Sequence, residues 1–156
     1  MKNLFFAVVL ITAMGCKTTP EVTISVDALQ FSEIIGKEWK LIEVHVDGTN
    51  INFNRYVLAD EGFNELFTLT FDEETISGVG APNRYSAPYT QEENQTITIK
   101  LARSTMMAPL REPEKLKEHD FFVYIQNVDN WDLVDDNLKL HSKNEAGAEV
   151  TMIFTL

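Results

Sequence analysis

Residues 77–89, SGVGAPNRYSAPY, follow an alternating run, LFTLTF at residues 66–71. The alternating run is typical of a strand with one buried face, and it places Phe67, Leu69 and Phe71 on the core side. The stretch after it is different, because its two glycines permit a positive φ or a close backbone approach and its two prolines donate no N–H to a sheet. Residues 77–89 are therefore predicted to form neither an ordinary strand nor a helix.

The same stretch contains the candidate ligand-binding or partner-binding residues, which are Asn83, Arg84, Tyr85 and Tyr89. They combine a compact amide, a guanidinium with five donors and two amphipathic rings. In one interpretation these side chains line a groove for a peptide strand or another extended ligand. In the other, Asn83 bonds to backbone groups of its own loop and the tyrosines fill the edge of the sheet. The sequence leaves both interpretations open.

Patterns outside this stretch indicate an α+β protein. Alternating apolar residues predict strands after Gly36, at residues 66–71 and 96–101, and in a three-strand meander over residues 131–154. One apolar stripe, in which Phe121 is followed by apolar residues at i+3, i+4 and i+7, predicts a single long helix over about residues 113–126. We therefore predict a mainly antiparallel curved sheet with one principal α-helix packed against it.

The same patterns predict which side chains face the core. Trp39, Leu41 and Glu43 should share one face of the first strand, and Leu101 should point inward. Residues 51–64 are longer than a hairpin needs and are predicted to be an irregular insertion with a short helical turn.

Two further expectations concern polar and sulfur-containing side chains. Lys117 and Glu118 are expected on the solvent side of the long helix. Met106 and Met107 are predicted to be core filler rather than a soft metal or partner contact.

Two motifs resemble the META domain, which is found in HslJ-type heat-inducible bacterial lipoproteins. The first is the spacing S-G-x-x-x-x-N-R-Y from Ser77, preceded by L-T-F and followed by Tyr89, and the second is G-K-x-W-x-L at residues 36–41. The resemblance covers residues 36–156. It implies that the curved sheet is an incomplete β-barrel, and that the protein is a non-enzymatic envelope module with a role in stress tolerance or envelope maintenance.

The resemblance also bears on a disulfide bond. Residues 104–109, STMMAP, are similar to the T-x-M-A-C segment of the family, and many members carry a second cysteine in the S-G motif. The matching positions here are Pro82 and Pro109. The resemblance thus implies that this disulfide is absent while the two loops remain neighbours, which predicts a Cα–Cα distance near the roughly 4.4–6.8 Å that a disulfide spans.

The N-terminus has the pattern of an export signal. Lys2 is followed by an apolar run at residues 4–11, far shorter than the roughly 20 residues that a spanning helix needs. Gly15 and Cys16 resemble a bacterial lipobox, whose cysteine becomes an acylated N-terminus. The alternative is a plain signal peptide with an incidental thiol, because Cys16 is the single cysteine of the chain.

Three segments follow from this pattern. A spacer is favoured for the second of them, although VTISV at residues 22–26 alternates as a short edge strand would. The predicted division is a signal peptide at residues 1–15, a lipidated N-terminus and tether at 16–30, and a META-like domain at 31–156.

The net charge of the chain limits the classes of molecule that it can bind. The chain carries a net charge of −11, so nucleic acid and anionic lipid surfaces would repel it. We expect attachment to the outer membrane or the periplasmic side of the bacterial envelope through acylated Cys16 alone, a monomeric protein, and an envelope protein or peptide as the candidate partner.

The sequence contains no recognisable catalytic motif. None of the three histidines, His45, His119 and His141, lies in a catalytic motif such as H-E-x-x-H or G-x-S-x-G. The acidic residues around Trp131 lack the spacing of a calcium-binding loop. We therefore predict no enzyme activity, no metal and no cofactor. Two alternatives stay open: a pilotin-like chaperone that holds a lipid chain or an amphipathic peptide in a cracked barrel and, more remotely, a small hydrolase.

Overall fold

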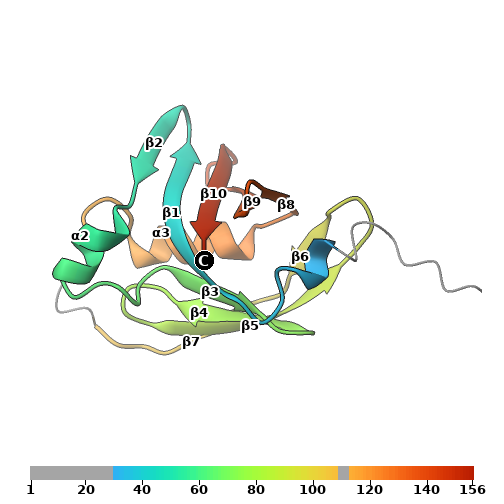
Figure 1. Ribbon diagram of the computed structural model, residues 1–156, viewed down its shortest axis with the longest axis horizontal. Helices are drawn as coiled ribbons and strands as arrows, with labels where there is room; N and C mark the ends of the chain where they lie inside the picture. The colour runs from blue at the N-terminus through green and yellow to red at the C-terminus, as the bar shows by residue number, and fades with distance from the viewer. Residues whose placement is uncertain (1–29, 109–112) are drawn as a thin grey trace, which may run out of the picture.

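The computed structural model describes residues 30–108 and 113–156 of the chain. Ten strands of this part form one antiparallel sheet in the order β6-β5-β4-β3-β1-β10-β9-β8, with β2 pairing β1 and β7 pairing β5. Figure 1 shows the sheet curving so that β3, β4 and β5 lie below while β1, β10, β9 and β8 lie above, with α3 between them in this view. The predicted α+β class and the incomplete barrel are confirmed.

The structure contains the predicted strands and, in addition, β2, β4, β5 and β7, which the alternating patterns do not predict. The bounds of the strands and helices are β1 (Glu38–Val46), β2 (Thr49–Asn52), α2 (Arg55–Asp60), β3 (Thr68–Phe71), β4 (Thr75–Val79), β5 (Arg84–Gln91), β6 (Ile97–Ile99), β7 (Arg103–Ser104), α3 (Glu118–Gln126), β8 (Asn130–Val134), β9 (Asn137–Lys143) and β10 (Glu149–Thr155).

The central stretch corrects the first prediction, because residues 77–89 belong mostly to two strands. β4 and β5 pair as a hairpin, and Gly78 lies opposite Tyr85. A Cβ atom on Gly78 would lie 2.0 Å from the backbone oxygen of Thr68, so glycine is required there by the close approach of β3. Pro88 is tolerated because its missing N–H falls where the pairing register of β5 shifts between β6 and β7. Glycine and proline here mark tight pairing and a bulge.

β1 corrects a second prediction. Its pairing with β10 shifts register between Leu41 and Glu43, which marks a β-bulge. The bulge exchanges the two faces of the strand, so Trp39, Leu41 and Val44 are buried while Glu43 is half-exposed. Residues 51–64 contain the end of β2 and the helix α2, in agreement with the predicted helical turn.

The core fills the barrel with aromatic side chains. Phe31 packs against Phe71, Tyr89 and Trp131 at ring-centroid distances of 5.4, 5.7 and 5.1 Å. In a second group of rings, the ring centroids of Phe67 and Phe121 lie 5.1 Å apart. Phe67, Leu69 and Phe71 are fully buried as predicted, but β3 begins only at Thr68 because Phe67 has a left-handed φ of 54°. These rings join both walls of the barrel into one core.

α3 is shorter than predicted, since it begins at Glu118 with Lys117 as its N-cap. Residues 113–117 are not helical, although Pro113 and Leu116 among them are buried. The predicted buried face is confirmed, because Phe121, Ile125 and Val128 are at most 4% exposed.

The meander of β8, β9 and β10 is also confirmed. Two predictions about outer positions are wrong. Leu101 is 83% exposed, and Met106 and Met107 are exposed rather than part of the core.

Several sequence predictions concern residues outside the described ranges. These are the signal peptide at 1–15, Cys16, the tether with its possible strand at 22–26, and Pro109. The expected closeness of Pro82 and Pro109 therefore stays a prediction. Two described residues near them do meet, because the Asn83 side chain is hydrogen bonded to the backbone of Met107.

Candidate functional site

Asn83 ties the β4–β5 hairpin to its surroundings with its whole side-chain amide. Its Nδ2 donates to Met107 O at 3.1 Å and to Glu118 Oε2 at 2.6 Å. Its Oδ1 accepts from Thr105 Oγ1 at 2.8 Å and from Met107 N at 2.7 Å. Asn83 is 6% exposed. These bonds are internal, and they hold the segment after β7 against the tip of the hairpin.

Glu118 is the charged partner in this network. Its Oε1 accepts from the backbone N–H groups of Ala81 and Asn83 at 2.5 and 2.6 Å. A carboxylate that accepts N–H bonds forms stronger hydrogen bonds than a neutral acceptor, and the first turn of α3 favours negative charge. Glu118 is half-buried, so its predicted place on the solvent side is wrong. The sequence feature that could have indicated this contact is an acidic residue in the first turn of a helix.

Tyr85 and Tyr89 point into the barrel. The Tyr85 hydroxyl donates to Thr68 O at 3.1 Å, and the Tyr89 hydroxyl donates to Asp72 O at 2.6 Å. Burial raises the pKa of Tyr85 well above its ordinary value. Burial, followed by the charges of Asp72 and Glu73, raises the pKa of Tyr89 to about 12. Both phenols are therefore neutral donors at neutral pH.

Arg84 differs from the other three candidate residues, because it is exposed. Its backbone N–H donates to Thr105 Oγ1 at 3.2 Å and its carbonyl accepts from Thr105 N at 3.0 Å. Among the four candidates, only the Arg84 side chain reaches the surface freely. Contact of the four residues with a ligand stays a prediction.

A seam separates the two edges of the incomplete barrel, between residues 97–107 on one side and β8 on the other. One end is closed, because Ile97 N donates to Asp129 O and Trp131 N donates to Gln95 O, each at 3.1 Å. In the middle the Gln126 side chain from α3 donates to Ile99 O at 3.0 Å and accepts from Ala102 N at 2.9 Å. The amide of Gln126 thus takes the place of a peptide group of a neighbouring strand.

A groove follows the seam beyond Gln126. It has a volume of about 410 Å³ and lies between β7 and α3. Ser104 lines it from β7, and the half-buried Phe122 and Val123 line it from α3. His119 and Glu145 form an ion pair at its rim, with 3.1 Å between Nε2 and Oε1.

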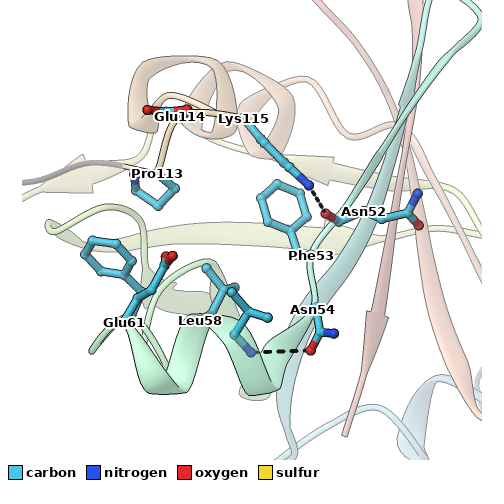
Figure 2. A pocket seen from close by; sticks show the side chains of 10 residues that line it. Asn52, Phe53, Asn54, Leu58, Glu61, Pro113, Glu114 and Lys115 are labelled. Carbon is cyan, nitrogen blue, oxygen red and sulfur yellow. Dashed lines mark hydrogen bonds between the residues drawn. The ribbon is translucent and has the colours of Figure 1, made fainter.

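A larger cleft of about 540 Å³ lies between α2 and the turn before α3. Figure 2 shows Phe53 and Leu58 between α2 and the turn that carries Lys115, and Glu61, the residue that follows α2, pointing toward Pro113. At its upper rim Lys115 Nζ donates to Asn52 O at 3.1 Å. A volume in this range suits a small ligand or a few peptide side chains.

α2 forms one wall of the cleft and is firmly anchored. Asn54 caps the helix by accepting from Tyr56 N and Val57 N. The Arg55 guanidinium donates to the carbonyl oxygens of Leu41, Asn64 and Leu66, and burial lowers its pKa from the ordinary value. No sequence pattern indicates this anchor or the cleft, because the partners of Arg55 are backbone groups that no motif specifies.

This architecture is shared with a known protein family. The family model of the META domain matches residues 32–154. The chain belongs to the META domain family. The match begins near the first described residues and ends inside β10, so the whole barrel, with α3, is the META domain.

Two solved structures are similar to this META domain. The NMR structure of a protein from Burkholderia xenovorans has a TM-score of 0.57 at 16% identity and covers 90% of this chain and 99% of its own. The crystal structure of a DUF4847 family protein from Bacteroides vulgatus has a TM-score of 0.51 at 15% identity and covers 80% of this chain and 94% of its own. At these identities the likeness shows the fold alone. A comparison with curated proteins finds no match.

The histidines of the META domain form pairs with acids. His45 pairs with Glu43 at 2.9 Å. His141 Nε2 lies 2.8 Å from Asp132 Oδ2, and its Nδ1 lies 3.2 Å from Thr151 Oγ1. The order carboxylate, imidazole, hydroxyl occurs in hydrolases, but His141 and Asp132 here are about a third exposed and line neither of the two cavities above.

Within residues 30–108 and 113–156, no group of three or more His, Cys, Asp and Glu residues is arranged to hold a metal ion. No helix in the same ranges has both the length and the apolar character needed to cross a bilayer.

Proposed function

We propose that this META domain protein is a non-enzymatic, membrane-tethered lipoprotein of the bacterial envelope, of the HslJ type, with a role in stress tolerance or envelope maintenance. The division of the sequence supports the proposal. The family match begins at residue 32, and the residues before it contain a basic start, an apolar run at 4–11 and the Gly15-Cys16 pair. Such a segment is typical of export followed by acylation.

The charge of the chain makes the acyl chains the main source of membrane affinity. With a net charge of −11 the domain gains nothing from anionic headgroups. Several acyl chains on one cysteine anchor a protein stably, whereas a single chain is marginal. The barrel would then stand at the membrane surface on the tether that leads to residue 31.

Expression of the full chain in a bacterium tests the anchor. The native protein should partition into detergent, and its N-terminal peptide should begin at Cys16 with the added mass of several acyl chains. Cys16→Ser should remain uncleaved or move to the soluble fraction, while the matched control Thr18→Ser should behave like the native chain. A native protein that is soluble and begins at another residue would overturn the proposal.

The cleft beside α2 favours a second candidate, a pilotin-like chaperone or binding module. Its apolar floor and its volume of about 540 Å³ suit part of a lipid chain or amphipathic peptide. Val57 lines the cleft and is 50% exposed, whereas its neighbour Tyr56 is 85% exposed and lies outside the lining.

Mass spectrometry of species that copurify with the chain tests this second role. A lipid or peptide should copurify with the native protein and with Tyr56→Lys, but should be lost from Val57→Lys, which places a charge in the cleft. Both variants should melt like the native protein because both positions are exposed. Equal retention by the two variants would exclude the cleft.

A further inference from the structure

The outer face of the sheet around β5, in the lower layer of Figure 1, carries three neighbouring cations. Side chains of β5 alternate between exposed and buried, and Arg84, Ser86 and Pro88 are on the exposed side. Arg103 of β7 lies opposite Ser86. Lys100 continues the pairing register of β6, and its N–H donates to Pro88 O at 2.8 Å. Because residues opposite each other share a face, Arg103 and Lys100 point outward like Arg84.

The three cations follow one another along β5 at a regular spacing. Arg84 and Arg103 are diagonal neighbours, which lie roughly 7–8 Å apart on an antiparallel pair and are within reach of long side chains. Lys100 stands opposite the next outward position of β5, roughly 6.6 Å further along the strand. Arg84, Arg103 and Lys100, called the basic row below, thus cover three successive outward positions of β5.

The strands around the basic row contribute no negative charge. β3, β4, β5, β6 and β7 contain neither Asp nor Glu, although the chain has 24 acidic residues. Within the described ranges, none of Arg84, Arg103 and Lys100 forms an ion pair with a carboxylate. Cations of the upper layer differ, since Lys40 and Lys143 each lie 3.6 Å from a glutamate oxygen. The basic row is therefore available to an external anion.

Short hydroxyl side chains lie beside the basic row. Ser86 lies opposite Ser77 of β4, and Ser77 lies opposite Thr70 of β3. All three side chains are at least partly exposed. A hydroxyl can donate a hydrogen bond to an anion, and a short side chain leaves the neighbouring guanidinium groups accessible. This face therefore suits an anion with several oxygen atoms.

Acids at the ends of the basic row limit how wide that anion can be. The turns at residues 72–74 and 92–93 are acidic and lie beyond one end, where Tyr89 N donates to Glu74 O. Glu65 precedes β3 near the other end. A membrane surface or a nucleic acid would extend over these acids and be repelled by them. A single peptide segment would cover the basic row alone.

An extended peptide also matches the spacing of the basic row. Alternate residues of an extended chain point to the same side and repeat every roughly 6.6 Å, as the outward positions of β5 do. The fork of a guanidinium group binds a carboxylate through two parallel hydrogen bonds, which are stronger than bonds between neutral groups. Carboxylates at alternate positions of one segment could thus each meet one cation.

We propose that the basic row binds an extended acidic segment of another protein, with carboxylates at alternate positions of that segment on Arg84, Arg103 and Lys100. The Ser86 hydroxyl, beside both arginines, donates to the bound carboxylates. The segment lies across the face of the sheet and adds no strand to it. The proposal is independent of acylation at Cys16 and of the cleft beside α2.

The probe is a capped synthetic heptapeptide in which three aspartates alternate with four serines. It is titrated at low ionic strength into the purified, isotope-labelled full chain carrying Cys16→Ser, and NMR follows the backbone amides and the arginine Nε–H groups. Saturable shifts should appear at the basic row and at Ser86.

Two control peptides test the charge and its spacing. A peptide with asparagine in place of each aspartate keeps the hydrogen-bonding groups without the charge, and it should give no saturable shift. Equal binding of this peptide would overturn the acidic partner. A peptide with the same three aspartates in one run should bind more weakly than the alternating one. Equal binding of that peptide would overturn the extended arrangement.

Two double variants separate the basic row from the charge of the whole chain. Arg84→Gln with Arg103→Gln should lower the affinity by about tenfold or more, because each guanidinium loses charge-assisted bonds. Lys37→Gln with Lys143→Gln changes the net charge equally at exposed positions outside the row, and its affinity should stay within about twofold of the native chain. Both should melt like the native chain, because all four positions are exposed. Equal losses of affinity would overturn the proposal, since binding would then follow net charge alone.

Two further measurements test other occupants of the basic row. Vesicles of phosphatidylglycerol should show no binding that depends on Arg84 and Arg103. Vesicle binding that is lost in their double variant would overturn the proposal in favour of an anionic membrane. Without peptide, the shifts of the basic row should not change with protein concentration. Shifts that grow with concentration would overturn it in favour of an acidic turn of a second copy.

Discussion

β5 and the segment at residues 103–108 lie beside each other in the barrel wall, yet they differ in what they offer to a partner. β5 buries Tyr85, Ala87 and Tyr89 on one face and is paired on both of its edges. Residues 103–108 are exposed throughout, and along β7 they pair on one edge. The Asn83 amide joins the two segments. The position of a strand in the sheet, more than its residue types, decides which of the two segments is exposed.

The largest effect should come from the side chain that packs behind β5. Phe121 is fully buried, with its ring centroid 5.1 Å from that of Phe67 and 5.9 Å from that of Tyr85. Phe121→Ala should lower the free energy of unfolding by about 3–5 kcal/mol, measured by chemical denaturation. Met106→Ala on the exposed segment should change it by less than about 0.5 kcal/mol. Similar values for the two variants would erase the contrast between the segments.

A smaller effect is expected at Gly78 in the strand that pairs with β5. An added methyl group would meet the backbone of Thr68, which has no flexible end that can move aside. Gly78→Ala should therefore cost about 3 kcal/mol, at the upper end of the usual range for overpacking. Gly80→Ala should cost less, because its neighbours are the side chains of Phe122 and Glu118. Denaturant midpoints in the opposite order would show that the hairpin does not press on β3 as described.

Glu118 should give a moderate effect, since it fixes the tip of the hairpin to α3. Glu118→Gln keeps one acceptor but turns an amide N–H₂ toward the Asn83 amide, which leaves donors unpaired. The expected loss is about 2 kcal/mol in thermal or chemical unfolding. The matched control Glu114→Gln lies on an exposed residue and should stay within about 0.5 kcal/mol of the native chain. A stable Glu118→Gln variant would mean that packing alone holds α3 in place.

The smallest effect is a dependence of stability on alkaline pH. The pKa of Tyr89 is raised to about 12 in the folded protein, while an unfolded tyrosine titrates near pH 10. The folded state therefore holds its proton longer, and the stability from Tyr89 is complete below about pH 10 and is lost as the pH rises through the folded pKa. Tyr89→Phe should weaken this decline in unfolding experiments. A decline that is identical without Tyr89 would assign it to other groups.

Much of the fold follows from sequence patterns that are local. Alternation predicts the buried faces of β3 and of the C-terminal meander, because side chains of a strand alternate whatever lies beside it. The apolar stripe likewise predicts the buried face of α3 around Phe121. Resemblance to the META domain adds the incomplete barrel. The buried faces are determined by residues that lie close together in the sequence.

The errors fall where distant segments decide the outcome. The bulge in β1 is set by its pairing with β10, and the need for glycine at Gly78 is set by Thr68. Met106 is exposed because it lies beyond the end of β7, at a position that no property of methionine indicates. Glu118 is half-buried because the backbone of the hairpin tip is its partner. Such features require the sheet order, which the sequence patterns do not specify.

Amide hydrogen exchange of the native chain without any peptide tests the difference between the two segments most directly. Protected amides are expected at Tyr85, Thr105 and Met107, whose N–H groups pair within the sheet or with Asn83. Fast exchange is expected at Ser104 and Met106, because Thr105 directs its N–H to Arg84 O, so its neighbours on either side should direct theirs away from β5, where the segment is exposed. Protection at Ser104 and Met106 equal to that at Thr105, at every protein concentration, would contradict this difference, because the edge would then be covered by the chain itself.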